Sequence, residues 1–248
     1  MEKIAIVTGG GRGIGAATSI LLGQKGYAVC VNYLKDESSA FEVLNTIESN
    51  GGVGILCQGD VSIEQDVINL FEKTSKYLGQ PTALVNNAGI LFRQSRLVDM
   101  TAERFRKIME VNIDGVFLCC REAIRRMSIR NGGNGGSIVN VSSAATRYGS
   151  PNEYVDYAAS KGAVDVLTLG LAREVAEEKI RVNCVRPGLI YTDIHASGGE
   201  PERIDRLKGL VPMKRGGTAE EVAQSIFWLL SDEASYVTGS LLDISGGR

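Results

Sequence analysis

The chain lacks the features that would place it in a membrane, on a nucleic acid or around a structural metal. No apolar run approaches the ~20 residues that a membrane-spanning helix needs. Lysine and arginine number 27 against 29 aspartates and glutamates, so there is no basic excess of the kind that nucleic-acid or membrane-surface binding requires. With a single histidine, His195, and no Cys-x-x-Cys pair, a metal site is not expected.

The cysteines do not follow the pattern of a disulfide-stabilised protein. They number five, an odd count, and all stand among apolar residues: Cys30, Cys57, Cys119, Cys120 and Cys184. Such residues are typical of reduced, buried thiols in cytoplasm. The opening run MEKIAIVTGG leads directly into a strand-like segment and has no signal-peptide pattern. We therefore expect a cytoplasmic protein.

The sequence does contain a regular alternation of short β-rich runs and longer helical patterns. The apolar runs are nearly continuous, as in strands that are covered on both faces of a sheet. The expected strands are residues 3–8, 27–33, 53–58, 83–87, 137–142, 180–186 and 240–245. Helical stretches such as GIGAATSILLGQKG and SIEQDVINLFEKTSKYLG separate them. This order predicts an α/β fold with a doubly wound, seven-stranded parallel sheet and helices on both faces.

A single domain is expected to include all 248 residues, because no linker or change in composition divides the chain. The glycine-rich run NGGNGGS, residues 131–137, is short, and we interpret it as a turn before a strand.

A second glycine-rich run, TGGGRGIG at residues 8–15, joins the first expected strand to the first helix. The common Gly-x-Gly-x-x-Gly spacing fails because Ile14 would occupy its last position, whereas Thr-Gly-x-x-x-Gly-x-Gly fits with Gly9, Gly13 and Gly15. Backbone amides at a helix N-terminus favour a diphosphate. A tight structural turn is the plainer alternative, but the position between strand and helix favours nucleotide binding.

The end of the second strand bears on the choice between NAD and NADP. NAD sites usually place an acidic residue there to bond the ribose 2′-hydroxyl, but this strand ends in Asn32 and Tyr33. Asp36 lies beyond the strand and suits a cap of the next helix. Arg12 and Lys35 offer positive charge to a 2′-phosphate, although ordinary solvated charge explains them too. The sequence favours NADP(H).

The run YVDYAASK, residues 154–161, places two tyrosines before one lysine. In a helix both Tyr154 and Tyr157 come near the face of Lys161, because each residue turns the chain by about 100°. Tyr157 stands one turn away, whereas Tyr154 lies roughly 10 Å along the axis. An ammonium ion beside a phenol favours the phenolate, so Tyr157 and Lys161 are the candidate pair. Taken alone, the run is more simply a helix that contains these residue types.

Several segments together resemble the short-chain dehydrogenase/reductase family, in its single-domain branch, and the resemblance spans essentially the whole chain. The matching segments are TGGGRGIG, Asp60 in GDVS, NNAG (86–89), Asn112 in EVNIDGVF, the serines of VNVSS, Tyr157-Ala-Ala-Ser-Lys161, RPG (186–188) and TGSLLDISGG. The chain looks most similar to bacterial 3-oxoacyl-ACP reductases and glucose 1-dehydrogenases. The resemblance implies a Rossmann-type NAD(P)-binding domain and an oxidoreductase that interconverts a carbonyl and an alcohol.

By this resemblance the catalytic residues are Asn112, Ser143, Tyr157 and Lys161. Tyr157 would act as general acid in reduction and general base in oxidation, while Lys161 would lower the phenol pKa and bond the nicotinamide ribose. Ser143 would bond the substrate oxygen, with Ser142 as the alternative. Asn112 would hold a water molecule in a proton relay to Lys161. The plainer alternative is that Asn112 is a buried amide whose hydrogen bonds are made by backbone groups.

The resemblance also implies a set of cofactor-binding residues at the carboxyl ends of the strands, where ligands of open α/β sheets bind. They are Gly9, Gly11, Arg12, Gly13, Ile14, Gly15, Asn32, Tyr33, Asp60, Val61, Asn87, Ala88, Gly89, Tyr157, Lys161, Pro187, Gly188, Ile190 and Thr192. As a plainer alternative, Pro-Gly after a strand is often only a turn.

The substrate side is less determined. Residues 193–217 suit a mobile lid, in which His195, Glu200 and Arg203 would contact a polar substrate or face water. A basic patch at an acyl-carrier-protein site is hinted at by arginines 93, 96 and 104, with solvated charge as the default. A nucleotide-binding redox sensor without turnover is the alternative function. Relatives usually form homotetramers through two long helices, here expected at 102–129 and 154–177, and through the C-terminal segment. Such apolar helices equally suit a core.

Overall fold

The computed structural model of the chain describes residues 3–248. The strands are β1 (Ile4–Val7), β2 (Ala28–Tyr33), β3 (Val53–Gln58), β4 (Ala83–Asn86), β5 (Gly136–Val141), β6 (Ile180–Pro187) and β7 (Leu241–Ile244). The helices are α1 (Gly13–Gln24), α2 (Glu37–Ser49), α3 (Glu64–Tyr77), α4 (Ala102–Met109), α5 (Gly115–Met127), α6 (Ala145–Tyr148), α7 (Val155–Glu174), α8 (Ile194–Ser197), α9 (Arg203–Leu207) and α10 (Ala219–Leu230). A π-helical turn, Glu110–Asp114, joins α4 to α5.

The strands form one parallel sheet in the order β3-β2-β1-β4-β5-β6-β7. The chain first builds outward from β1 to β3 and then returns to build from β4 to β7 on the other side. The order therefore reverses between β1 and β4, and at such a point the connections leave a crevice at the carboxyl ends of the strands. This topology confirms the fold that the alternating pattern predicts.

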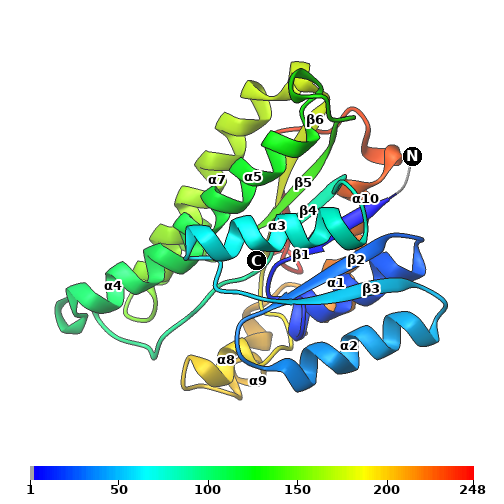
Figure 1. Cartoon of the computed structure of the whole chain (residues 1–248). Helices are drawn as coiled ribbons and strands as arrows, with labels where there is room; N and C mark the ends of the chain where they lie inside the picture. The colour runs from blue at the N-terminus through cyan, green and yellow to red at the C-terminus, as the bar shows by residue number, and fades with distance from the viewer. Residues whose placement is uncertain (1–2) are drawn as a thin grey trace.

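Helices cover both faces of the sheet (Figure 1). On one face α1 packs against α2 and α10, and on the other α3 packs against α5 while α7 lies on β6. Alternate residues of each strand serve the two faces: Ile6 belongs to the core cluster with α3 and α5, and Ala5 and Val7 belong to the cluster with α1 and α2. Burial on both faces is the physical reason for the nearly continuous apolar strands.

All seven expected strands are present, and none of their ends differs by more than one residue. The expected helix over 102–129 is corrected, because the π-helical turn interrupts it and α5 ends at Met127. The expected helix over 154–177 is shorter, since α7 runs from Val155 to Glu174 and Tyr154 is its N-cap residue. Asp36 caps α2, as predicted, by accepting a hydrogen bond from the Ser39 amide.

All five cysteines are buried and free. Over residues 3–248, none of the helices combines the length and the apolar character that crossing a membrane would take.

Candidate active site

A cavity of about 510 Å³ opens at the carboxyl ends of the strands, a size typical of small-molecule sites. Its walls come from the segments that follow β1, β2, β3, β4, β5 and β6, together with α7 and the start of the 193–217 segment. Of the sequence-predicted residues it is lined by Gly9, Gly11, Arg12, Gly13, Ile14, Asn32, Tyr33, Asp60, Val61, Asn87, Ala88, Gly89, Ser143, Tyr157, Lys161, Pro187, Gly188, Ile190 and Thr192. Gly15 and Asn112 are not among the lining residues.

The glycine-rich loop forms one end of the cavity. Gly9 and Gly13 have φ angles of +58° and +52°, a backbone conformation that side-chain-bearing residues rarely adopt. Gly15 serves packing instead, because a Cβ there would lie 2.2 Å from the Gly9 carbonyl oxygen. The first turn of α1 holds no acidic residue, and Arg12 precedes it in an extended conformation. Free amides and the positive end of the helix dipole therefore face the cavity.

Asn32 holds this loop in place from the end of β2. Its Oδ1 accepts a hydrogen bond from the Gly9 amide at 3.2 Å, and its Nδ2 donates to the carbonyls of Cys57 and Gly59 at 3.2 and 3.1 Å. Asn87 acts similarly from β4, since its Nδ2 donates to the carbonyls of Thr8 and Gly9 at 2.9 and 3.0 Å. Both amides are committed to the loop, so they shape the cofactor end of the cavity rather than offer free donors to it.

The opposite end of the cavity contains Tyr157 and Lys161. Both side chains project from α7, and Lys161 Nζ lies 5.7 Å from the centre of the Tyr157 ring. The ammonium donates a hydrogen bond of 2.8 Å to the Val141 carbonyl at the end of β5. Tyr154 also lines the cavity, but it stands before the first turn of α7 and its ring stacks under Arg203, 5.0 Å away. The two tyrosines therefore have different surroundings.

Burial shifts the pKa values of the pair in opposite directions. It raises the pKa of Tyr157 to about 12, while hydrogen bonding with Ser143 lowers this pKa and the nearby Tyr148 raises it. Lys161 is not among the groups that lower the phenol pKa here. Burial lowers the pKa of Lys161 to about 8, and Cys184 and Asp165 oppose this change. Near neutral pH the phenol therefore carries its proton, as a general acid must.

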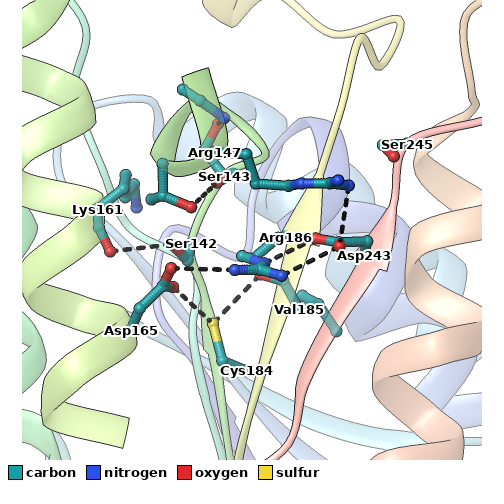
Figure 2. A network of polar contacts seen from close by, with 12 residues as sticks. Ser142, Ser143, Arg147, Lys161, Asp165, Cys184, Val185, Arg186, Asp243 and Ser245 are labelled. Atoms are coloured by element: carbon teal, nitrogen blue, oxygen red, sulfur yellow. Dashed lines mark hydrogen bonds and ion pairs between the residues drawn. The ribbon is translucent and has the colours of Figure 1, made fainter. Parts of the chain in front are cut away.

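The two candidate serines are separated by their contacts. Ser142 Oγ donates to the Lys161 carbonyl at 3.0 Å and is buried, as Figure 2 shows. Ser143 is directed to the Tyr157 side, where it lies close enough to lower the phenol pKa. Its Oγ also accepts a hydrogen bond of 3.1 Å from the Ala145 amide. The structure thus places Ser143, and not the Ser142 hydroxyl, beside the candidate proton donor.

Asn112 lies in the π-helical turn and is fully buried. Its Oδ1 accepts from the Ile90 amide at 2.8 Å, and its Nδ2 donates to the Ile90 carbonyl and to Ser160 Oγ. A Cβ added at Gly89 would lie 3.3 Å from Asn112 Oδ1 and 3.4 Å from Lys161 Nζ. The Ile90 backbone and the Ser160 hydroxyl therefore satisfy the Asn112 amide, which also adjoins the space next to Lys161.

The residues expected to face a substrate are largely paired with one another. Arg203 is 5% exposed, forms an ion pair with Glu153 and contacts Glu200 at 3.0 Å. Arg203 is therefore not a solvated charge, and it lines the cavity, so contact with a substrate stays a prediction. Arg104 contacts Asp156 at 2.7 Å, which removes it from the suggested basic patch. The side chain of His195 lies outside the described part of the structure.

Sequence reasoning missed part of the cavity wall. The missed residues are Leu34, Ser39, Gly59, Ile90, Leu91, Lys107, Val111, Val141, Ala145, Tyr148, Ser150 and Leu189. Many adjoin recognised motifs, so their position in the chain is the signal that could have found them. Tyr148, the last residue of α6, and Ser150 lie between the serines and α7, for example, and both line the cavity.

The cavity fits the dinucleotide that the glycine-rich loop implies. Gly9, Gly13 and Gly89 form a cradle that a Cβ would fill, with Lys161 and Asn112 at one end of it. The diphosphate would lie at the N-terminus of α1 and the nicotinamide beside Lys161 and Tyr157. The residues that line the cavity are therefore sufficient to hold both the diphosphate and the nicotinamide.

The sequence and the fold both match known oxidoreductases. The chain matches the family model described as Enoyl-(Acyl carrier protein) reductase over residues 9–248. It is 59% identical to the uncharacterized oxidoreductase YgfF of Escherichia coli over 99% of each chain. The chain belongs to the short-chain dehydrogenase/reductase family.

Other members of this dehydrogenase/reductase family are similar over nearly the same length. Glucose 1-dehydrogenase 2 of Bacillus subtilis is 36% identical, over 99% of this chain and 94% of its own. The 3beta-hydroxysteroid dehydrogenase 1 of Eggerthella lenta is 39% identical, over 99% and 93%. A dehydrogenase/reductase from Sinorhizobium meliloti superposes with a TM-score of 0.91 at 31% identity, over 99% of this chain and 94% of its own. This short-chain dehydrogenase/reductase is therefore an NAD(P)-dependent enzyme that acts on CH–OH groups, which disfavours the alternative of a sensor without turnover.

Proposed function

We propose that this enzyme is an NADP(H)-dependent oxidoreductase that interconverts a carbonyl and an alcohol, with Tyr157 as the group that donates or accepts the proton. One observation carries the proposal: the Tyr157 phenol and the Lys161 ammonium share one wall of the cavity, with their ring-to-nitrogen distance at 5.7 Å. Tyr154, the other tyrosine of this run, lies outside α7 and stacks on Arg203 instead.

The residues around Tyr157 suit both the protonated phenol and the phenolate that it forms. In the reductive direction the phenol gives its proton to the substrate oxygen, and its raised pKa keeps the phenol protonated near neutral pH until then. Ser143 would hydrogen-bond the same substrate oxygen as negative charge develops on it. We expect the positive charge of Lys161 to favour the phenolate that remains, although Lys161 does not lower the pKa of the phenol in this structure. A bound nicotinamide nucleotide supplies or accepts the hydride.

Asn112 would bind a water molecule that relays protons to Lys161. Its side chain adjoins the space between Gly89 and Lys161 Nζ, and its amide is fixed by Ile90 and Ser160. A water molecule in that space would bridge the amide and the ammonium. We propose this relay as the route by which the Tyr157–Lys161 pair recovers a proton after each turnover.

The adenosine end of the cavity supports NADP(H) rather than NAD(H). Both oxygens of Asp36 are used, since Oδ1 accepts from the Ser39 amide at 3.0 Å and Oδ2 from Ser39 Oγ at 2.7 Å. Arg12 and Lys35 line the same region, are exposed and form no ion pair within residues 3–248. Two available cations and an occupied carboxylate favour a ribose 2′-phosphate over a 2′-hydroxyl.

The substrate side supports an uncharged carbonyl compound. Arg203 is the arginine of this wall, and it is already paired with Glu153 and Glu200. Hydrogen bonding with Arg206 and Arg203 holds the pKa of Glu200 at about 2, so the ion pairs persist at any working pH. The neighbouring wall is aromatic and apolar, with Leu91 and Tyr148. An anionic substrate would find no free positive charge in these residues.

The deciding experiment combines a substrate panel with two matched variants. The purified protein with NADPH is offered aldehydes, ketones, sugars and 3-oxoacyl thioesters, and loss of the reduced nicotinamide absorbance is followed. Tyr157→Phe is expected to lose at least about 100-fold in kcat while it still binds NADPH. Tyr154→Phe is expected to retain kcat, with any change confined to KM. Carbonyl reduction that survives in Tyr157→Phe but not in Tyr154→Phe would reassign the proton donor.

We also propose a homotetramer, assembled through α4, α5 and α7, in the cytoplasm. Phe105, Phe117 and Val166 are 43%, 50% and 69% exposed on these helices, more than such residues usually are. The five free thiols suit a reducing compartment.

A further inference from the structure

A series of alternating charges runs from helix α7 to the edge strand β7 (Figure 2). Asp165 begins it, and Lys161 stands one helical turn before Asp165 on α7. Arg186 of β6 places Nη1 3.6 Å from Asp165 Oδ2 and donates from Nε to Asp243 Oδ1 at 2.7 Å. Arg147 of α6 places Nη1 3.2 Å from Asp243 Oδ2. Positive and negative groups alternate along the whole series.

Asp165 is the carboxylate of this series that shares helix α7 with Lys161. It follows Lys161 by four residues on α7, so the two side chains leave the same face of the helix one turn apart. Asp165 is 7% exposed, and the thiol of Cys184 lies 3.6 Å from its Oδ1. A buried carboxylate is stable only with partners. Arg186 supplies the positive charge that keeps Asp165 in this place.

The surroundings of Lys161 contain few charges. Its ammonium bonds the Val141 carbonyl of β5, and the Tyr157 ring and the neutral Asn112 amide lie nearby. Cys184 of β6 stays an uncharged thiol near neutral pH, because burial raises its pKa to about 12. Asp165 is therefore the negative charge that acts on Lys161 from the elements packed around it.

Burial acts against the ammonium form of Lys161. The side chain is 3% exposed, and its pKa lies at about 8 even with Asp165 present. Loss of the carboxylate would leave a buried cation with one carbonyl partner, and the nearby Arg186 would keep only Asp243 of its two carboxylate partners. Two positive groups without an intervening anion disfavour protonation of the weaker one.

We propose that Asp165 is a positioning residue that keeps Lys161 protonated in the working pH range, and that Arg186 and Asp243 fix the Asp165 carboxylate for this purpose. The consequence for turnover rests on the proposed role of Lys161 beside Tyr157. The protonation state of Lys161 is independent of that proposed role, and it can be measured without substrate or cofactor. The two claims can therefore fail separately.

The test is a pH titration of the lysine ammonium groups by NMR. Lysine is labelled with ¹³C at Cε, and the Lys161 signal is assigned by its absence in Lys161→Met. Its midpoint is expected to fall in Asp165→Asn by about 0.5–1 pH unit, and to return toward the wild-type value in Asp165→Glu. Asp156→Asn is the matched control, since Asp156 is buried on the same helix and pairs with Arg104 instead. Its midpoint is expected to equal that of the wild type.

An unchanged midpoint in folded Asp165→Asn, or an equal fall in Asp156→Asn, overturns the proposal. If Asp165→Asn does not fold, Asp243→Asn gives the answer, because it removes the second carboxylate of Arg186 and keeps Asp165. The Lys161 midpoint is expected to fall less in Asp243→Asn than in Asp165→Asn. An unchanged midpoint in Asp243→Asn would contradict the role of Arg186 and Asp243 in fixing Asp165. The alkaline limb of the kcat profile for reduction should move with the midpoint. A shifted midpoint with an unmoved limb upholds Asp165 and removes Lys161 from the proposed mechanism.

Discussion

Ser142 Oγ donates a hydrogen bond of 3.0 Å to the backbone carbonyl of Lys161 and so fastens the end of β5 to the middle of α7. The adjacent Ser143 follows the strand and lies beside the Tyr157 phenol. Two neighbouring hydroxyls thus have separate partners, one a backbone carbonyl and the other the candidate proton donor. Replacing each in turn separates stability from chemistry.

Ser143→Ala is expected to lower kcat by about 100-fold or more, because the developing oxyanion loses a hydrogen-bond donor. Ser142→Ala is expected to lower the free energy of unfolding by about 1 kcal/mol and to change kcat much less. Steady-state kinetics and urea unfolding of both variants provide the measurement. Equal losses of kcat in the two variants would contradict the separation of roles.

The depressed pKa of Lys161 predicts a specific pH dependence of stability. The ordinary pKa of lysine is 10.5 and that of folded Lys161 is about 8, so between these values the unfolded chain binds more protons. Stability therefore rises with pH across this window. Relative to Lys161→Met, the wild type should gain about 2 kcal/mol between pH 7 and pH 9.5. Urea unfolding of both proteins at the two pH values measures this gain, and parallel curves would contradict it.

Cofactor preference can be tested at Arg12. Arg12→Ala is expected to weaken NADPH binding about tenfold or more and to leave NADH binding nearly unchanged, because the guanidinium would meet only the 2′-phosphate. Arg106→Ala, an exposed arginine on α4, is the control and should alter neither affinity. Titration calorimetry of the wild type and both variants with each cofactor measures all six constants. An equal loss for both cofactors would place Arg12 at the diphosphate, and tighter NADH binding by the wild type would overturn the preference itself.

Asn32 is expected to control the shape of the cofactor site through the glycine-rich loop. Asn32→Asp keeps the size of the side chain but turns its donor, which serves Cys57 and Gly59, into a buried anion facing two carbonyls. The free energy of unfolding should fall by about 2–4 kcal/mol, and NADPH and NADH affinity should fall by the same factor.

The matched control is Asn45→Asp, on the exposed face of α2, which should change stability by less than about 0.5 kcal/mol. Thermal unfolding and cofactor titration report both quantities. A loss confined to NADPH would show that Asn32 meets the 2′-phosphate directly instead of acting through the loop.

The sequence alone was sufficient for the sheet and for the glycine-rich loop. Strands buried on both faces leave continuous apolar runs, and Gly9 and Gly13 mark a turn with positive φ angles that other residues rarely adopt. The Tyr157–Lys161 pair was also predictable, because helical geometry relates residues four apart regardless of what surrounds them. These features depend on neighbours in the chain, so local rules apply to them.

Tertiary structure alone decided how buried polar groups are paired. The sequence could not show that Asn112 lies in a π-helical turn or that Arg203 is paired with Glu153. Nor could it show that Arg186 lies between Asp165 and a carboxylate of β7. Each partnership joins segments far apart in the chain, and its strength depends on distance and burial. Those two quantities exist only once the sheet has brought the segments together.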